Sequence, residues 1–156
     1  MMIAVASDHG GVELKEFLVQ ILLSRKIEVE DFGTKGKESV DYPDFGRLVA
    51  LKVAKGEAER GILICTNGIG MSILANKFPG VRAALVQDLK GAQMSREHNN
   101  SNILVLGGGV TEKSLAEKIL QVWIETPFAA GRHQRRLDKI AQVEQELGSR
   151  VKDGAR

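Results

Sequence analysis

The feature that most constrains the fold of this chain is a regular alternation between short apolar runs and longer segments of helical period. The runs have the length and the β-branched content of strands. The expected strands span residues 3–6, 27–32, 61–65, 81–86 and 102–106. The expected helices span residues 12–26, 44–55, 69–77, 89–97 and 111–125. Strands that alternate with helices in this way are typical of βαβ units, in which the strands run parallel.

Two of the runs, ILIC at 62–65 and NILVL at 102–106, are almost continuously apolar. Such strands are expected in a sheet that is covered on both faces. We therefore predict an α/β fold, a Rossmann-like three-layer α/β/α sandwich around a five-stranded parallel sheet, plus a C-terminal helix.

That last helix is expected after Pro127, over residues 134–147. One stripe along it carries Leu137, Ile140, Val143 and Leu147. The helix either caps the domain or crosses to a second subunit. We expect a single domain over residues 1–148, with a frayed tail at 149–156, where apolar anchors are few.

Composition and charge exclude several classes of protein. The chain has 156 residues, 43% of them hydrophobic and 27% charged, which suits one ordinary globular domain. Its 22 basic and 20 acidic residues give a net charge of +2, so neither nucleic acid nor a membrane is an expected partner. The first residues lack the basic region of a signal peptide, and no apolar stretch approaches the ~20 residues that span a bilayer. A single cysteine allows no internal disulfide, so we expect a cytoplasmic location.

Ligands of parallel sheets bind beyond the carboxyl ends of the strands, so the strand ends are the first place to look for a site. The first expected strand is followed by SDHGG at 7–11, and the third ends at Cys65 before TNGIG at 66–70. GIGMSI lacks the third glycine of a dinucleotide fingerprint, and no Gly-Lys-Ser/Thr follows, so both nucleotide motifs are rejected. What remains is a turn whose amides at residues 67–70 face a helix start and suit an anion.

Each candidate residue also has an ordinary structural explanation. Cys65 is either a thiolate favoured by the loop or a buried small apolar residue. Asp8 and His9 either contact a substrate or cap the first helix. His98 and Asn99 fit a helix C-terminus. Because they precede a strand, we expect them at the sheet edge opposite Cys65, where a partner subunit would have to supply them for any shared chemistry.

Arg132 and Arg136 are four residues apart on an expected helix, an arrangement that suits a phosphate. The alternative is a solvated basic face shared with Arg135 and Lys139. The three histidines and the single cysteine have no metal-ligand spacing, so no metal site is expected.

Taken together, the ordered motifs resemble the ribose-5-phosphate isomerase type B family, which includes galactose-6-phosphate and allose-6-phosphate isomerases. The resemblance covers nearly the whole chain, up to about residue 147. Its markers are SDHGG (7–11), DYPDF (41–45), GILICTNGIGMSILANK (61–77), VRAALV (81–86), SREHNNSNILVLGG (95–108) and GRHQRR (131–136).

This resemblance implies an aldose–ketose isomerase of phosphorylated sugars that works through an enediolate, without metal or organic cofactor. It implies that Cys65 is the base moving a proton between C2 and C1, that His98 opens the sugar ring, and that Asp8 contacts sugar hydroxyls. Further implied substrate contacts are Tyr42, Thr66, Asn67, Gly68, Ile69, Gly70 and Asn99, and implied phosphate contacts are His9, Arg132 and Arg136.

Ribose 5-phosphate is the expected substrate, and a six-carbon sugar phosphate is the alternative. A non-catalytic sugar-phosphate-binding module is a third hypothesis, against which stands the presence of both Cys65 and His98, since binding alone needs no thiol. We expect a homodimer or a dimer of dimers with sites shared between subunits.

The sequence departs from the family pattern in two places. Thr66-Asn67 stands where the family commonly has glycine followed by threonine or serine, a change that bears on hydroxyl recognition. Gly109 stands where many members carry arginine, which bears on phosphate affinity and on the preferred sugar length.

Overall fold

The chain forms a five-stranded parallel sheet between two layers of helices in a computed structural model, which describes residues 1–153, with side-chain surroundings over residues 1–148. The strands are β1 (Met2–Ser7), β2 (Glu28–Asp31), β3 (Arg60–Cys65), β4 (Ala83–Leu85) and β5 (Ile103–Gly107). Their order across the sheet is β2-β1-β3-β5-β4, and every neighbouring pair is parallel. The predicted three-layer α/β/α sandwich is therefore confirmed, with β4 shorter than the expected 81–86 strand.

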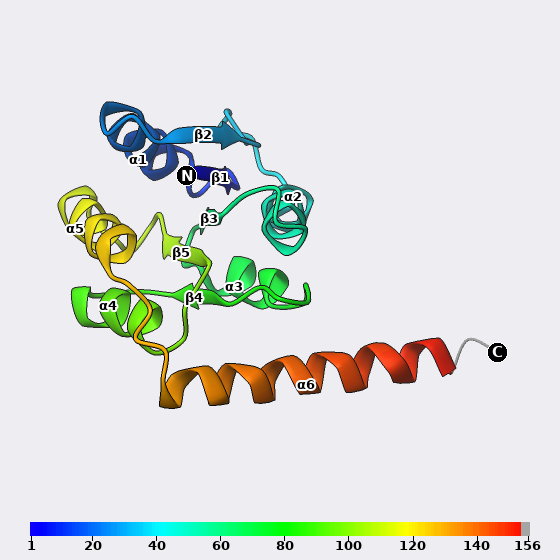
Figure 1. Cartoon of the computed structure of the whole chain (residues 1–156). Helices are drawn as coiled ribbons and strands as arrows, with labels where there is room; N and C mark the ends of the chain where they lie inside the picture. Colours follow the sequence, from blue (N-terminus) through cyan, green and yellow to red (C-terminus); the bar gives the residue numbers. More distant parts are fainter. Residues whose placement is uncertain (154–156) are drawn as a thin grey trace.

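Helices cover both faces of the sheet, as the continuous apolar strands predicted. They are α1 (Val12–Ser24), α2 (Tyr42–Ala54), α3 (Ile69–Ala75), α4 (Leu89–Glu97), α5 (Lys113–Glu125) and α6 (Arg132–Asp153). Figure 1 shows α1, α4 and α5 on one face and α2 and α3 on the other. Two buried clusters follow from this arrangement, one on each face.

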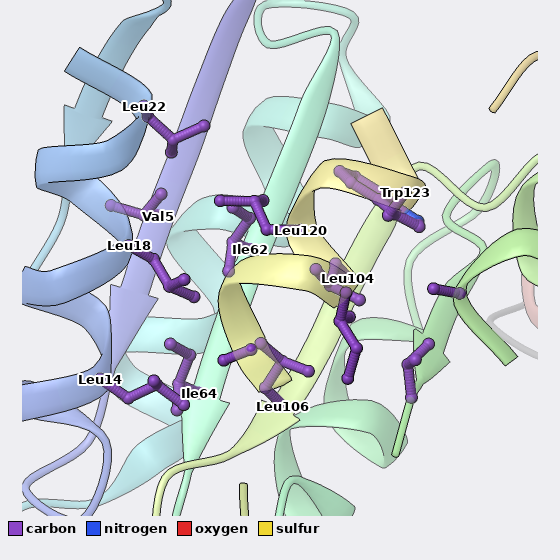
Figure 2. Packing of buried hydrophobic residues seen from close by; sticks show 14 of the residues in the cluster. Val5, Leu14, Leu18, Leu22, Ile62, Ile64, Leu104, Leu106, Leu120 and Trp123 are labelled. Atoms are coloured by element: carbon purple, nitrogen blue, oxygen red, sulfur yellow. The ribbon is translucent and has the colours of Figure 1, made fainter. Parts of the chain in front are cut away.

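The larger cluster lies between the sheet and α1, α4 and α5 (Figure 2). Strand residues such as Ile62 and Leu104 meet Leu18 of α1 and Leu120 of α5 there, all 1% exposed or less. Trp123 closes one end of this cluster and donates its indole N–H to Ser101 Oγ at 2.8 Å. The cluster holds the strands in register and so fixes where each strand ends.

Helix α6 extends along one side of the molecule and beyond the sheet (Figure 1). Of its predicted apolar stripe only Leu137 is buried, whereas Ile140, Val143 and Leu147 are 48%, 53% and 56% exposed. A cleft of about 550 Å³ separates this stripe from β4 and α4. The helix includes residues 149–153 of the expected tail, and residues 154–156 lie outside the described residues, so the expected fraying stays a prediction.

Candidate active site

The carboxyl ends of β1, β3 and β5 meet at one edge of the sheet. Cys65 is the last residue of β3, and Asp8 directly follows β1. Gly108, just after β5, donates its amide to the Cys65 carbonyl at 2.8 Å. A Cβ atom on Gly10 would lie only 2.2 Å from Thr66 Oγ1, so the loop after β1 touches the loop after β3. The structure thus brings the SDHGG and TNGIG motifs together.

Cys65 is a buried residue whose sulfur also contacts the backbone of the following loop. Its side chain is 5% exposed and belongs to the cluster on the α2 and α3 face. Its Sγ also accepts a hydrogen bond from the Gly68 amide at 3.2 Å. Gly68 has a φ of +80°, a conformation that glycine adopts without steric cost. The loop therefore turns an N–H toward the sulfur, where it would meet the negative charge of a thiolate.

Two of the four amides expected to bind an anion are used by the loop itself. Gly68 donates to the sulfur, and Ile69 donates to Asn67 Oδ1 at 3.0 Å. Within the described part of the chain, the amides of Asn67 and Gly70 have no acceptor. These two N–H groups are therefore free to donate. The turn closed by the Asn67 side chain was not expected, although asparagine two residues before a helix commonly forms one.

Asp8 and His9 are both held by backbone amides near the sulfur loop. Asp8 is 6% exposed, and its Oδ1 accepts the Gly10 amide at 2.9 Å, so it closes the turn before α1, whose N-cap is Gly11. His9 Nδ1 accepts the Val40 amide at 3.2 Å. A neutral imidazole that accepts at Nδ1 carries its proton on Nε2, which is then the donor available to an anion.

Tyr42, the first residue of α2, borders the same loop. A Cβ atom on Gly70 would lie 2.7 Å from Tyr42 Cζ, so the phenol ring rests directly against the glycine backbone. Only glycine permits this approach, and the ring then forms one wall beside the free Gly70 amide.

The remaining candidates lie at the opposite end of the strands. His98 ends α4 and Asn99 follows it, just before β5. Because β3 and β5 are paired from Gly61–Ile103 to Cys65–Gly107, the length of the paired strands, about 13 Å, separates this end from the sulfur. Arg132 and Arg136 are exposed on the first turns of α6. Within one chain these residues do not meet Cys65.

His98 has a neighbour that the sequence did not reveal. Its ring stacks on the ring of His133 from α6, with centroids 4.2 Å apart and planes 10° from parallel. Burial, and then the nearby charges of His98, Arg132 and Arg136, lower the pKa of His133 below its usual value, while Glu97 opposes them. Burial and the basic neighbours therefore disfavour the protonated form of His133.

Neither a metal centre nor a membrane helix is found in the described part of the chain. Among residues 1–153 there is no group of three or more histidine, cysteine, aspartate or glutamate side chains placed to hold an ion. None of the helices described is both long and apolar enough to cross a bilayer.

The sequence is similar to known sugar-phosphate isomerases along nearly its whole length. Residues 3–140 match the family described as Ribose/Galactose Isomerase. Ribose-5-phosphate isomerase B of Escherichia coli is 45% identical over 143 residues, which cover 92% of this chain and 96% of that one. A putative sugar phosphate isomerase of Bacillus subtilis is 48% identical over 147 residues, 94% of this chain and 99% of that one.

Solved structures agree with these sequence matches. Ribose-5-phosphate isomerase B of Clostridium thermocellum superposes with a TM-score of 0.93 at 50% identity, over 94% of this chain and 99% of that one. Ribose-5-phosphate isomerase B of Mycoplasma genitalium, solved with bound ribulose 5-phosphate, has a TM-score of 0.90 at 42% identity, over 93% of this chain and 97% of that one.

Proposed function

Because this chain belongs to the ribose/galactose isomerase family, we propose that it interconverts ribose 5-phosphate and ribulose 5-phosphate, a step of pentose phosphate metabolism, through an enediolate. The bound ribulose 5-phosphate of the Mycoplasma genitalium relative supports this substrate. The observation that carries the proposal is the position of Cys65, whose sulfur ends β3 beside the free amides of Asn67 and Gly70.

The proposed chemistry uses these groups in sequence. The Cys65 thiolate takes the proton from C2 of the open-chain aldose and returns it to C1, while the proton of the C2 hydroxyl passes to the C1 oxygen, so that the carbonyl moves from C1 to C2. Negative charge that develops on the substrate oxygens is met by the Asn67 and Gly70 amides, which are already oriented and need no reorganisation. Loss of one donor of this kind costs about 3 kcal/mol of transition-state stabilisation in other enzymes. Asp8 contacts the hydroxyls, and Nε2–H of His9 contacts the phosphate.

Ring opening needs a second acid or base, and this role is proposed for His98. Since His98 lies at the other end of the strands, it would come from a second copy of the chain, together with Asn99, Arg132 and Arg136. Two observations support a dimer: the half-exposed apolar stripe of α6, and the cleft of about 550 Å³ beside it. A homodimer or a dimer of dimers then contains sites made from two subunits.

The role of Cys65 is tested by solvent exchange. Substrate incubated in deuterated water is expected to gain label next to the carbonyl with the wild-type protein. Cys65→Ala is expected to lose both labelling and turnover. Wild-type rates in Cys65→Ala would refute the assigned base. Sugar-phosphate binding by calorimetry without isomerisation of any tested sugar would instead favour a binding module.

Shared sites are tested by mixing two inactive variants. Cys65→Ala and His98→Ala, once their subunits have exchanged, are expected to regain part of the activity, because a hybrid dimer contains one site with both wild-type groups. Absence of recovery despite demonstrated exchange would count against the shared site. A charge placed in the exposed stripe, Ile140→Asp, is expected to make activity depend on protein concentration, whereas the adjacent exposed change Lys139→Asp should not.

A six-carbon sugar phosphate is the second candidate substrate, and Gly109 is the residue that supports it. This turn borders a hollow of about 510 Å³ formed by residues 108–114, and no side chain extends from residue 109 into it. The comparison of kcat/KM for ribose 5-phosphate, allose 6-phosphate and galactose 6-phosphate, without added metal and then with chelator, separates the two candidates. A cytoplasmic location is part of the proposal and is supported by the single cysteine.

A further inference from the structure

His98 stacks on His133, a residue that the proposed reaction does not use. The centroids are 4.2 Å apart, the planes differ by 10°, and the His133 side chain is 7% exposed. Within the described residues, neither ring nitrogen of His98 has a hydrogen-bond partner. A face-to-face stack fixes the plane of the ring and leaves its nitrogen-bearing edge free.

The backbone around the pair brings the two rings together. Ala129 donates its amide to the carbonyl of Glu97 at 3.0 Å, which ties the segment before α6 to the end of α4. Ala130 and Gly131 then turn the chain with φ values of 51° and 55°. His133 donates its own amide to the Ala130 carbonyl at 3.0 Å. These three backbone features place the ring of His133 against the ring of His98.

The groups around His133 lower its pKa. It faces His98 and Glu97 of α4 and lies beside Arg132 and Arg136 of α6. Burial and the three basic neighbours lower the pKa of His133, and only Glu97 opposes them. A positive charge on the His133 ring would be repelled by Arg132 and Arg136 and by any charge on His98. These surroundings disfavour the protonated form of His133, and the stack presents the flat face of its ring to His98.

We propose that His133 is a positioning residue, whose stacked ring holds the plane of His98 so that the free edge of His98 faces the ring oxygen of a cyclic sugar phosphate. This rests on the proposed function, in which His98 opens the ring. Misplacement of a catalytic group by about 1 Å costs roughly 100-fold in rate, so the stack has a measurable kinetic role.

Two variants of similar buried volume separate positioning from packing. His133→Phe keeps a flat ring and His133→Leu does not, and Gln134→Ala on the exposed side of the same turn is the control. Each is assayed in two ways. Conversion of ribose 5-phosphate requires ring opening. Deuterium exchange at C1 of ribulose 5-phosphate does not, because that ketose has its C5 hydroxyl phosphorylated and stays open.

His133→Leu is expected to lower kcat for ribose 5-phosphate about 10- to 100-fold, with KM and the exchange rate within roughly 2-fold of wild type. His133→Phe is expected to recover most of kcat, and Gln134→Ala should match wild type. Unchanged conversion in His133→Leu, equal loss of conversion and exchange, or no recovery in His133→Phe would each overturn the positioning role.

A spectroscopic measurement reports the stack without kinetics. The chain has only three histidines, so the ring signals of His98 can be assigned by single substitutions. They are expected to show a ring-current shift that is lost in His133→Leu and kept in His133→Phe. Signals that do not change in His133→Leu would exclude the stack. If the wild-type protein itself neither exchanges nor converts, the proposed function fails, which is a separate outcome.

Discussion

Lys15 places a charged side chain in the interior, and within the described part of the chain Asp31 is its one ion-pair partner. The Lys15 side chain is 1% exposed, and its Nζ lies 2.5 Å from Asp31 Oδ2 at the end of β2. The Asp31 side chain is 26% exposed, and its other oxygen accepts the Gly33 amide at 2.9 Å. Gly33 in turn accepts the amide of Ser7, one residue before Asp8. The pair therefore links α1 to the segment that supports the site.

The two ends of this pair should respond very differently to mutation. Asp31→Asn leaves a buried ammonium without its counter-charge, which costs about 3–5 kcal/mol of unfolding free energy. Lys15→Met removes the buried charge and leaves a carboxylate that water reaches and that keeps its bond to Gly33. Its expected cost is the lost charged hydrogen bond, about 1.5–3 kcal/mol. The change that alters the side chain least is therefore expected to be the more destabilising one.

Urea unfolding followed by circular dichroism, at one protein concentration for all variants, measures the difference. The control is Lys37→Ala, because Lys37 and its partner Glu13 are 80% and 66% exposed. Water screens that exposed pair, so its loss should leave the free energy of unfolding nearly unchanged. The reasoning is refuted if Lys15→Met destabilises the protein as much as Asp31→Asn, or if both behave like the exposed control.

Three further outcomes are expected. Gly70→Ala should lower kcat/KM at least about 10-fold with little change in stability, since its Cβ would meet the Tyr42 ring at 2.7 Å and displace the wall beside the free amide. Trp123→Phe should destabilise the protein by about 1–3 kcal/mol in urea unfolding, because it removes the indole bond to Ser101 and leaves space in the core. The lowered pKa of His133 means that the unfolded chain binds more protons, so the free energy of unfolding should fall as pH drops below about 6.5, and His133→Phe should reduce this slope.

The sheet could be predicted because its strands carry their own signal. Ile62, Ile64, Leu104 and Leu106 alternate with residues that are buried on the other face, such as Leu63, so the apolar runs are continuous. A covered parallel sheet is the arrangement in which both sets of side chains leave water. The positions of Cys65 and Asp8 followed from this, since parallel strands share one carboxyl edge.

The contacts between side chains from distant elements could not be predicted in the same way. Lys15 and Asp31 are both charged residues on segments with amphipathic patterns, and nothing local marks one of them as buried. His133 stood among the basic residues of GRHQRR, where a solvated face is the usual outcome. Because α6 packs against the end of α4, His133 and Leu137 are buried, whereas the adjacent Arg132 is exposed.

The direction of the strands sets the limit on what one copy of this chain can do. Loops that follow parallel strands collect at one edge, so Cys65 and Asp8 meet, whereas His98 precedes a strand and lies about 13 Å away along the sheet. His98 is held at the end of α4, so it could reach Cys65 of the same chain only if α4 unfolded. In the proposed enzyme, the second edge must come from another copy. Helix α6 suits this task, because its half-exposed apolar stripe adjoins the exposed face with the arginines proposed to bind phosphate, so subunit contact and phosphate binding would depend on the same helix.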